Sequence, residues 1–99
     1  MGPNANSNTE KKTDKQVMRE HIRMIDRSSR KVEREIGKLD ALEKKQLKEV
    51  EKLAKKGQHA AAKTVAKTVA MSRKQKNNFY NMSAQLKGMS MQLQSMNVS

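Results

Sequence analysis

Two histidines and ten carboxylates are the residues of this 99-residue sequence that could support acid–base or metal chemistry, because it contains no cysteine. A metal site on a helix needs a second ligand one turn away, and neither His21 nor His59 has one at i+4. The sequence also lacks a glycine-rich phosphate loop and a Ser/His/Asp arrangement. We therefore predict no catalytic residue, no metal site, no cofactor and no enzyme activity.

The chemistry that this sequence does carry is positive charge. The net charge is +12. All ten acidic residues lie in residues 1–56, whereas residues 57–99 hold basic residues and no acid. The basic residues of this second part are Lys63, Lys67, Arg73, Lys74, Lys76 and Lys87. Such an excess of positive charge favours a polyanionic partner, either nucleic acid or an anionic membrane surface.

The elements that must position these charges are helices, since good helix formers fill the chain and Pro3 is its one proline. Thr13 and Gln16 form a T-x-x-Q capping box, which predicts a helix beginning at about residue 14 and ending at about residue 56. A 4-3 spacing of mainly apolar residues predicts a coiled-coil-like seam. The seam residues are Met18, Ile22, Ile25, Ser29, Val32, Ile36, Leu39, Glu43, Gln46, Val50 and Leu53.

The opposite side of this first helix is predicted to be a basic face. The heptad places basic residues mainly at the outer positions, while Asp26, Glu33 and Asp40 flank the seam. We predict that the basic face binds an acidic membrane; an ordinary solvated face is the alternative. Its residues are Arg19, Arg23, Arg27, Arg30, Lys31, Arg34 and Lys38.

Gly57 decides whether the chain is a hairpin or a rod. It follows the basic pair Lys55 and Lys56, and glycine in left-handed conformation commonly ends a helix. We therefore predict a tight turn at Gly57 and a second helix over about residues 58–97, folded back antiparallel on the first. The alternative is one continuous helix that tolerates Gly57 at a cost of about 1 kcal/mol.

The second helix has its own stripe at the same spacing. It is predicted to run through Ala61, Val65, Thr68, Ser72, Gln75, Phe79, Met82, Leu86, Met89, Leu93 and Met96. The larger residues form an apolar surface of the kind that packs against other helices. We predict that these residues contact a neighbouring subunit; ordinary hairpin core is the alternative. They are Phe79, Met82, Leu86, Met89, Leu93 and Met96.

Three segments together resemble a known family: the basic first helix, "LAKKGQHAAAKTVAKTVAMSRKQKN" and "FYNMSAQLKGMSMQLQSMN". They are similar to the N-terminal half of the ESCRT-III proteins, also called the charged multivesicular body or Snf7-domain family. The resemblance covers about residues 14–99, and its methionine-rich end looks most like the type 2 subclass, with type 3 next. It implies an all-α, long helical hairpin that is part of a larger ESCRT-III fold.

The resemblance also implies a function. Members form cytoplasmic filaments, peripheral on endosomal and other membranes, that act in endosomal sorting, vesicle budding and membrane scission. It implies other ESCRT-III subunits and acidic phospholipid membranes as partners, with the basic face as the membrane contact. In family members the acidic C-terminal half carries autoinhibition and recruits an AAA ATPase, so the resemblance also implies that partner. This half is absent here, so we expect this chain to be a piece of a longer protein.

The N-terminal residues depart from the family pattern. Members usually begin with a short aromatic, amphipathic segment, whereas "MGPNANSNTEKK" is polar, so we predict a flexible tail over residues 1–13. No apolar run is long enough to cross a bilayer. Two other functions stay open: a basic helical nucleic-acid-binding protein, and a coiled-coil adaptor whose charge only keeps it soluble. The low aromatic content is unfavourable for base stacking.

Overall fold

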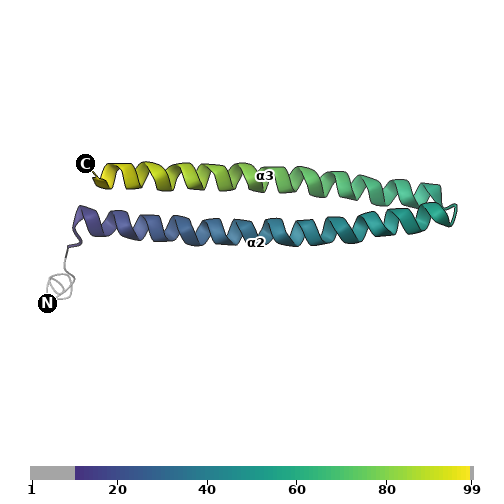
Figure 1. The fold of residues 1–99 in the computed structure, drawn as a ribbon, viewed down its shortest axis with the longest axis horizontal. Helices are drawn as coiled ribbons and strands as arrows, with labels where there is room; N and C mark the ends of the chain where they lie inside the picture. The colour runs from purple at the N-terminus through teal and green to yellow at the C-terminus, as the bar shows by residue number, and fades with distance from the viewer. Residues whose placement is uncertain (1–10, 99) are drawn as a thin grey trace, which may run out of the picture.

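The computed structural model describes residues 11–98, which form two long α-helices packed antiparallel (Figure 1). Helix α2 spans Asp14–Lys55 and helix α3 spans His59–Val98, and this part of the chain has no strand. The predicted all-α hairpin is confirmed, with helix ends within one residue of the expected ones at the turn. Most of the predicted N-terminal tail lies outside the described residues.

The start of α2 is fixed by the predicted capping box. The Thr13 hydroxyl accepts a hydrogen bond from the backbone N–H of Gln16 at 3.1 Å. The Gln16 side chain in turn accepts one from the Thr13 backbone N–H at 2.9 Å. Asp14 adds a negative charge to the first turn. These contacts satisfy N–H groups that have no partner within the helix, so the helix begins at this point.

The turn between the helices is a Schellman motif centred on Gly57. The Gln58 N–H donates to the Leu53 carbonyl at 2.9 Å, and the Gly57 N–H donates to the Ala54 carbonyl at 3.0 Å. Gly57 has a φ of +76°, in the left-handed region where only glycine is unstrained. The chain therefore reverses at the predicted residue, and the continuous helix is ruled out.

The inner face of α2 agrees with the predicted seam at every position. Each of its eleven residues is buried or half-buried, and Ile25 and Val32 are the most enclosed. Because large aliphatic side chains recur at 4-3 spacing, the sequence identifies which face of α2 packs against α3, and this prediction is confirmed.

On the inner face of α3, every second predicted seam residue is wrong by one position. Val65, Ser72, Phe79, Leu86 and Leu93 do face α2, as expected. The residues predicted between them are exposed, namely Ala61, Thr68, Gln75, Met82, Met89 and Met96. Their place is taken by Ala62, Val69, Lys76, Ser83 and Ser90. Small side chains at most of these positions let the two backbones approach closely, and the larger methionines are turned outward.

Four charged residues fix the register of the two helices near their middle. Lys76 Nζ lies 2.7 Å from Asp40 Oδ1 and 3.0 Å from Glu43 Oε1, and Arg73 Nε lies 3.3 Å from Glu43 Oε2. One turn away, the Gln46 side chain donates to the Thr68 hydroxyl at 3.3 Å. A slip of one helical turn would separate these partners, so they specify a single alignment.

Candidate functional site

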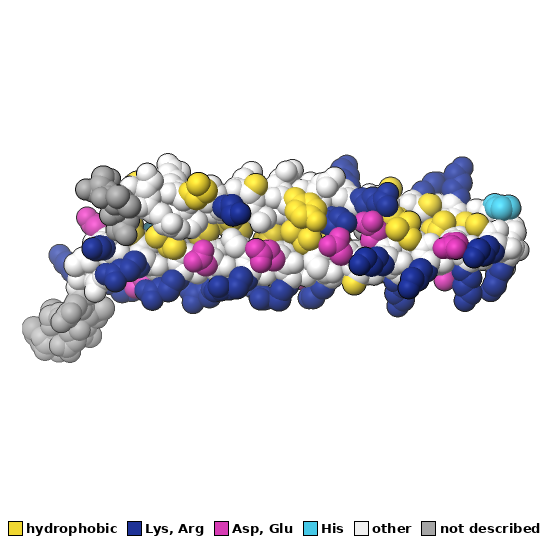
Figure 2. Space-filling model, viewed as in Figure 1, with side chains coloured by type: hydrophobic (Ala, Val, Ile, Leu, Met, Phe, Trp, Pro, Cys, Tyr) yellow, Lys and Arg dark blue, Asp and Glu magenta, His cyan; other side chains and the backbone are white. Residues whose placement is uncertain are grey.

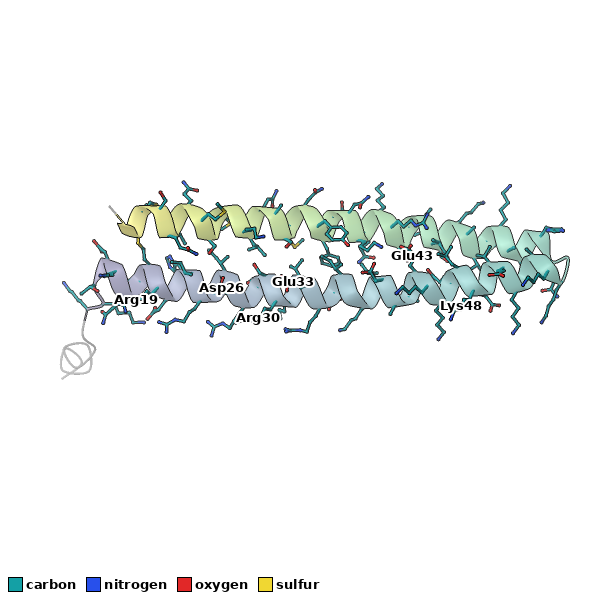
Figure 3. All side chains as sticks on the ribbon, viewed as in Figure 1. Arg19, Asp26, Arg30, Glu33, Glu43 and Lys48 are labelled. Carbon is teal, nitrogen blue, oxygen red and sulfur yellow. The ribbon has the colours of Figure 1, made fainter. Side chains whose placement is uncertain are left out.

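The seven predicted basic-face residues are all exposed in the structure. Lys and Arg side chains form a nearly continuous band along the side of α2 that faces away from α3 (Figure 2). Arg19 and Arg30 point away from α3, whereas Asp26 and Glu33 lie on the side toward it (Figure 3). The helix period thus separates the two signs of charge across α2.

This basic face is left largely without neutralising acids. Of its seven residues, only Lys38 forms an ion pair with an acid among residues 11–96, at 3.4 Å from Glu35. Three acids of α2 have other partners. Asp40 and Glu43 bind α3, and Glu20 is 2.6 Å from Lys12, whose hydrogen bond lowers the pKa of Glu20. A stripe of unpaired guanidinium and ammonium groups therefore faces solvent.

The ion cluster between the helices has the electrostatics of a structural contact. The hydrogen bond from Lys76 is the main cause that lowers the pKa of Glu43, with Arg73 adding to it. The hydrogen bond to Asp40, then the one to Glu43, raises the pKa of Lys76 above its usual value. The Lys76 and Glu43 side chains are 16% and 17% exposed. Each group is held in its charged form between the helices.

The residues predicted to contact a neighbouring subunit divide into two groups. Phe79, Leu86 and Leu93 are half-buried in the seam between α2 and α3. Met82, Met89 and Met96 are 44%, 52% and 55% exposed. They follow one another at heptad spacing, so they lie along one flank of the hairpin, which we call the methionine flank.

Met24 of α2 joins the methionine flank near the open end of the hairpin. A groove of about 440 Å³ lies here, and most of its lining is apolar. Its lining residues are His21, Met24, Ile25, Met89, Gln92, Leu93 and Met96. Thioether side chains are flexible and polarisable, which suits them to packing against another helix.

The two histidines lie at opposite ends of the hairpin, with His21 near the open end and His59 beside the turn. Within the described residues, no group of three or more histidine, aspartate or glutamate side chains could hold a metal ion. Neither described helix is long and apolar enough to cross a membrane.

Sequence reasoning missed the inward position of Lys76 and its cluster with Arg73, Asp40 and Glu43. A signal was present, because Lys76 lies one heptad after Val69 and two after Ala62. Following that row, instead of the larger methionines, would have placed Lys76 in the seam opposite the acids of α2.

Comparison with known proteins shows which family this chain belongs to. The family model described as Snf7 matches residues 13–99. This chain belongs to the Snf7 family. The hairpin of α2 and α3 is thus the structure of an Snf7-family segment, as the sequence resemblance indicated.

Several curated relatives of this Snf7-family chain have type 2 names. It is 41% identical over 86 residues to vacuolar protein sorting-associated protein 2 homolog 1 of Arabidopsis thaliana, covering 87% of this chain and 38% of the relative. It is 38% identical over 85 residues to charged multivesicular body protein 2a homolog 2 of Dictyostelium discoideum, covering 86% and 43%. It is 32% identical over 88 residues to ESCRT-III complex subunit did4 of Schizosaccharomyces pombe, covering 89% and 42%.

The first two of these relatives, whose names carry the number 2, favour type 2 over type 3 for this Snf7-family chain. It spans about two fifths of the length of the curated relatives it matches. No solved structure is a significant match.

Proposed function

We propose that this Snf7-family chain is a subunit of a membrane-remodelling filament that polymerises on acidic membranes. The observation that carries the proposal is the band of exposed, mostly unpaired basic residues on the outer side of α2. The names of the relatives, which include an ESCRT-III subunit and vacuolar protein sorting proteins, agree with it. The proposed roles are endosomal sorting, vesicle budding and membrane scission, at the cytoplasmic surface of endosomal and other membranes, with no catalytic step.

The strength of the proposed contact follows from the number of charges. Each Lys or Arg near an anionic lipid surface contributes about 1 kcal/mol, and salt weakens the contribution. The seven residues of the basic face are therefore enough for modest binding by one copy. A filament that presents many copies would bind far more tightly through avidity. Polymerisation and membrane binding thus support each other.

The proposed partners within the filament are other ESCRT-III subunits, either identical copies or related chains. The methionine flank is the proposed contact surface, because Met82 and Met89 are large, apolar and exposed. Contact with an AAA ATPase, expected from the family resemblance, would involve a part of the protein outside residues 1–99.

Nucleic acid is the second candidate polyanion, and the same basic charge is the observation that favours it. The two aromatic residues give it little support. Phe79 is half-buried in the seam and Tyr80 lies on α3, so neither provides a stacking platform on the basic face.

Reversal of charge on the basic face tests the proposal. The variant Arg23→Glu, Arg27→Glu, Arg30→Glu and Arg34→Glu should lose sedimentation with phosphatidylserine vesicles. Four lost contacts amount to about 4 kcal/mol, or roughly a thousandfold in affinity. The matched variant with lysine at the same four positions should bind as the wild type does, and both should keep the helix content seen by circular dichroism.

Two results would contradict the proposed membrane contact. One is sedimentation of the glutamate variant at wild-type protein concentrations. The other is displacement of the wild-type protein from vesicles by duplex DNA far more effectively than by salt of equal ionic strength, which would favour the nucleic-acid function.

A further inference from the structure

A second basic surface lies on α3, on the side of the hairpin opposite the basic face of α2. Lys63, Lys67 and Lys74 are exposed, and their spacing puts them on one outward side of α3. Figure 2 shows Lys and Arg side chains over α3 near the turn, across the molecule from the band on α2. We call Lys63, Lys67, Met71 and Lys74 the outer α3 face.

The charge of the outer α3 face is not neutralised within the described chain. Helix α3 has no acidic residue, and its ion pairs to α2 are made by Arg73 and Lys76. Lys63, Lys67 and Lys74 form no ion pair with any acid of residues 11–96. Farther along, the outward positions of α3 are uncharged. They are Asn77, Asn78, Asn81, Gln85 and Gly88, and the exposed Lys87 lies instead toward the groove that it lines with Asp26 and Met91. The charge is thus concentrated in the half nearer the turn.

Met71 distinguishes this face from a simply solvated row of lysines. It is 70% exposed, the highest value among the exposed large apolar residues, and it lies one turn from both Lys67 and Lys74. An apolar side chain among lysines suits a lipid interface, where it can enter the headgroup layer while the ammonium groups meet phosphates. A nucleic-acid backbone offers no such apolar layer, so the composition favours lipid.

The two basic surfaces are far enough apart to act separately. Two packed helices, each about 10 Å across with its side chains, put the outer surfaces roughly 20 Å apart. Charges at that distance are screened from each other at physiological salt, where the Debye length is about 8 Å. Contact at one surface therefore leaves the charge of the other available.

We propose that the outer α3 face binds a second anionic bilayer, so that the hairpin bridges two membranes, one on α2 and one on α3. The α2 contact in this arrangement rests on the proposed function. The α3 contact is additional, because a filament subunit could bind one membrane through α2 alone.

The test compares binding with bridging in the 99-residue chain, using vesicles of phosphatidylcholine and phosphatidylserine. Sedimentation measures binding, and energy transfer between two differently labelled vesicle populations measures their clustering. The variant Lys63→Glu, Lys67→Glu and Lys74→Glu should still sediment with vesicles. The protein concentration needed for clustering should rise roughly a hundredfold, because each lysine contributes about a fivefold factor at an anionic surface. Met71→Gln should weaken clustering in the same direction.

The matched control reverses three lysines on the other side of the same half of the hairpin. Lys44→Glu, Lys48→Glu and Lys52→Glu makes the same change in net charge on the outer side of α2, where the basic band continues past Lys38 toward the turn (Figure 2). It should reduce sedimentation and clustering together. A glutamine version of the α3 variant should behave like the glutamate one, and both should keep the helix content seen by circular dichroism, which excludes a folding artefact.

Each contrary outcome is distinct. Wild-type protein that sediments with vesicles without clustering them overturns the inference and leaves the proposed function intact. Clustering by the α3 variant at wild-type concentrations also overturns it, since the bridge would then be made by the filament itself. Absence of sedimentation overturns both proposals. Loss of duplex DNA binding in the α3 variant, with no vesicle clustering by the wild type, would assign the face to nucleic acid.

Discussion

Lys76 occupies a position where a helical seam ordinarily holds an apolar side chain. It is tolerated because two carboxylates of α2 surround it, Asp40 at 2.7 Å and Glu43 at 3.0 Å. Breaking one member of such a group is more costly than never having it, since the remaining charge loses its partner. The cluster is therefore expected to make the stability of the hairpin depend on pH.

The sign of this dependence follows from the pKa shifts. In the folded hairpin the pKa of Glu43 is lowered, chiefly by the hydrogen bond from Lys76. The unfolded chain thus binds a proton more readily, and the stabilisation from Glu43 is full above its ordinary pKa and is lost as pH falls through the lowered one. The raised pKa of Lys76 has the opposite effect, so its contribution is lost as pH rises through that value.

Thermal melting followed by circular dichroism checks the acid side of this prediction. The midpoint of the wild type should fall as the pH drops below about 4.5, the ordinary pKa of a glutamate. Glu43→Gln should melt a few degrees lower at neutral pH and show a weaker acid dependence. Glu49→Gln is the matched control, because Glu49 is exposed and forms no ion pair within residues 11–96. Equal acid dependence in the wild type and Glu43→Gln would contradict the assignment.

At the scale of the helices, the turn depends on one backbone conformation. Gly57 has a φ of +76°, and a Cβ atom added to it would meet no atom within 4 Å. The cost of replacing it is therefore expected mainly as backbone strain. Gly57→Val should destabilise the hairpin by roughly 1–3 kcal/mol, whereas Gly57→Asn should cost less because asparagine tolerates this region.

Replacement of a second glycine is expected to change the stability of the hairpin in the opposite direction. Gly37 lies inside α2 with open space around it. Gly37→Ala should stabilise the hairpin by about 1 kcal/mol because alanine is the better helix former. Urea unfolding of Gly57→Val and Gly37→Ala measures both effects. A Gly57→Val hairpin as stable as the wild type would show that the turn does not require the left-handed residue.

The two helices also show where sequence reasoning succeeded and where it could not. The seam of α2 was predicted in full, because residues such as Ile25, Val32 and Leu39 leave one plausible rotation. In α3, two candidate seams contain the same residues at every second position, among them Val65 and Phe79. They differ by one residue at the positions between these. Small and polar residues complete one row and methionines the other, so hydrophobic spacing favoured the wrong one. The heptad row of Ala62, Val69 and Lys76 was the competing signal. Whether a seam accepts a lysine depends on the groups that face it, and in the structure Lys76 meets Asp40 and Glu43.

The basic face was easier to predict than the contact between subunits. Which residues share a helix face follows from the 3.6-residue period alone, so Arg23, Arg27 and Arg34 could be grouped from sequence. The role of that face remains a prediction. The division of the six contact residues into three half-buried and three exposed ones depends on the rotation of α3, which the spacing did not determine.

At the scale of the whole molecule, the hairpin is a thin rod with a shallow core. Its radius of gyration is 22.6 Å, well above the roughly 13 Å of a compact domain of this length. In the described part, no side chain is fully buried. Large apolar residues instead remain exposed on both flanks of the seam. Met24, Met82 and Met89 lie on one flank, and Leu47 and Tyr80 lie on the other.

Two different apolar flanks suit the growth of a filament. When one flank of a subunit meets the opposite flank of the next, the contact is heterologous and repeats without closing unless the rotation forms a ring. With the outer side of α2 directed to the membrane, both flanks would face sideways toward neighbours. This arrangement would add burial that the isolated hairpin lacks.

Charged substitutions on the methionine flank separate this contact from the hairpin seam. Met82→Asp and Met89→Asp should block polymerisation, because each puts a carboxylate into the proposed apolar contact. The hairpin of each variant should still melt cooperatively. Leu86→Asp should instead unfold the hairpin, since Leu86 is half-buried between the helices. Met71→Asp is the control, because Met71 is an exposed methionine of the same helix that lies about three turns before Met82 and does not line the groove of the methionine flank. Electron microscopy and light scattering without lipid measure assembly. Filaments formed by Met82→Asp and Met89→Asp as readily as by Met71→Asp would place the contact between subunits elsewhere.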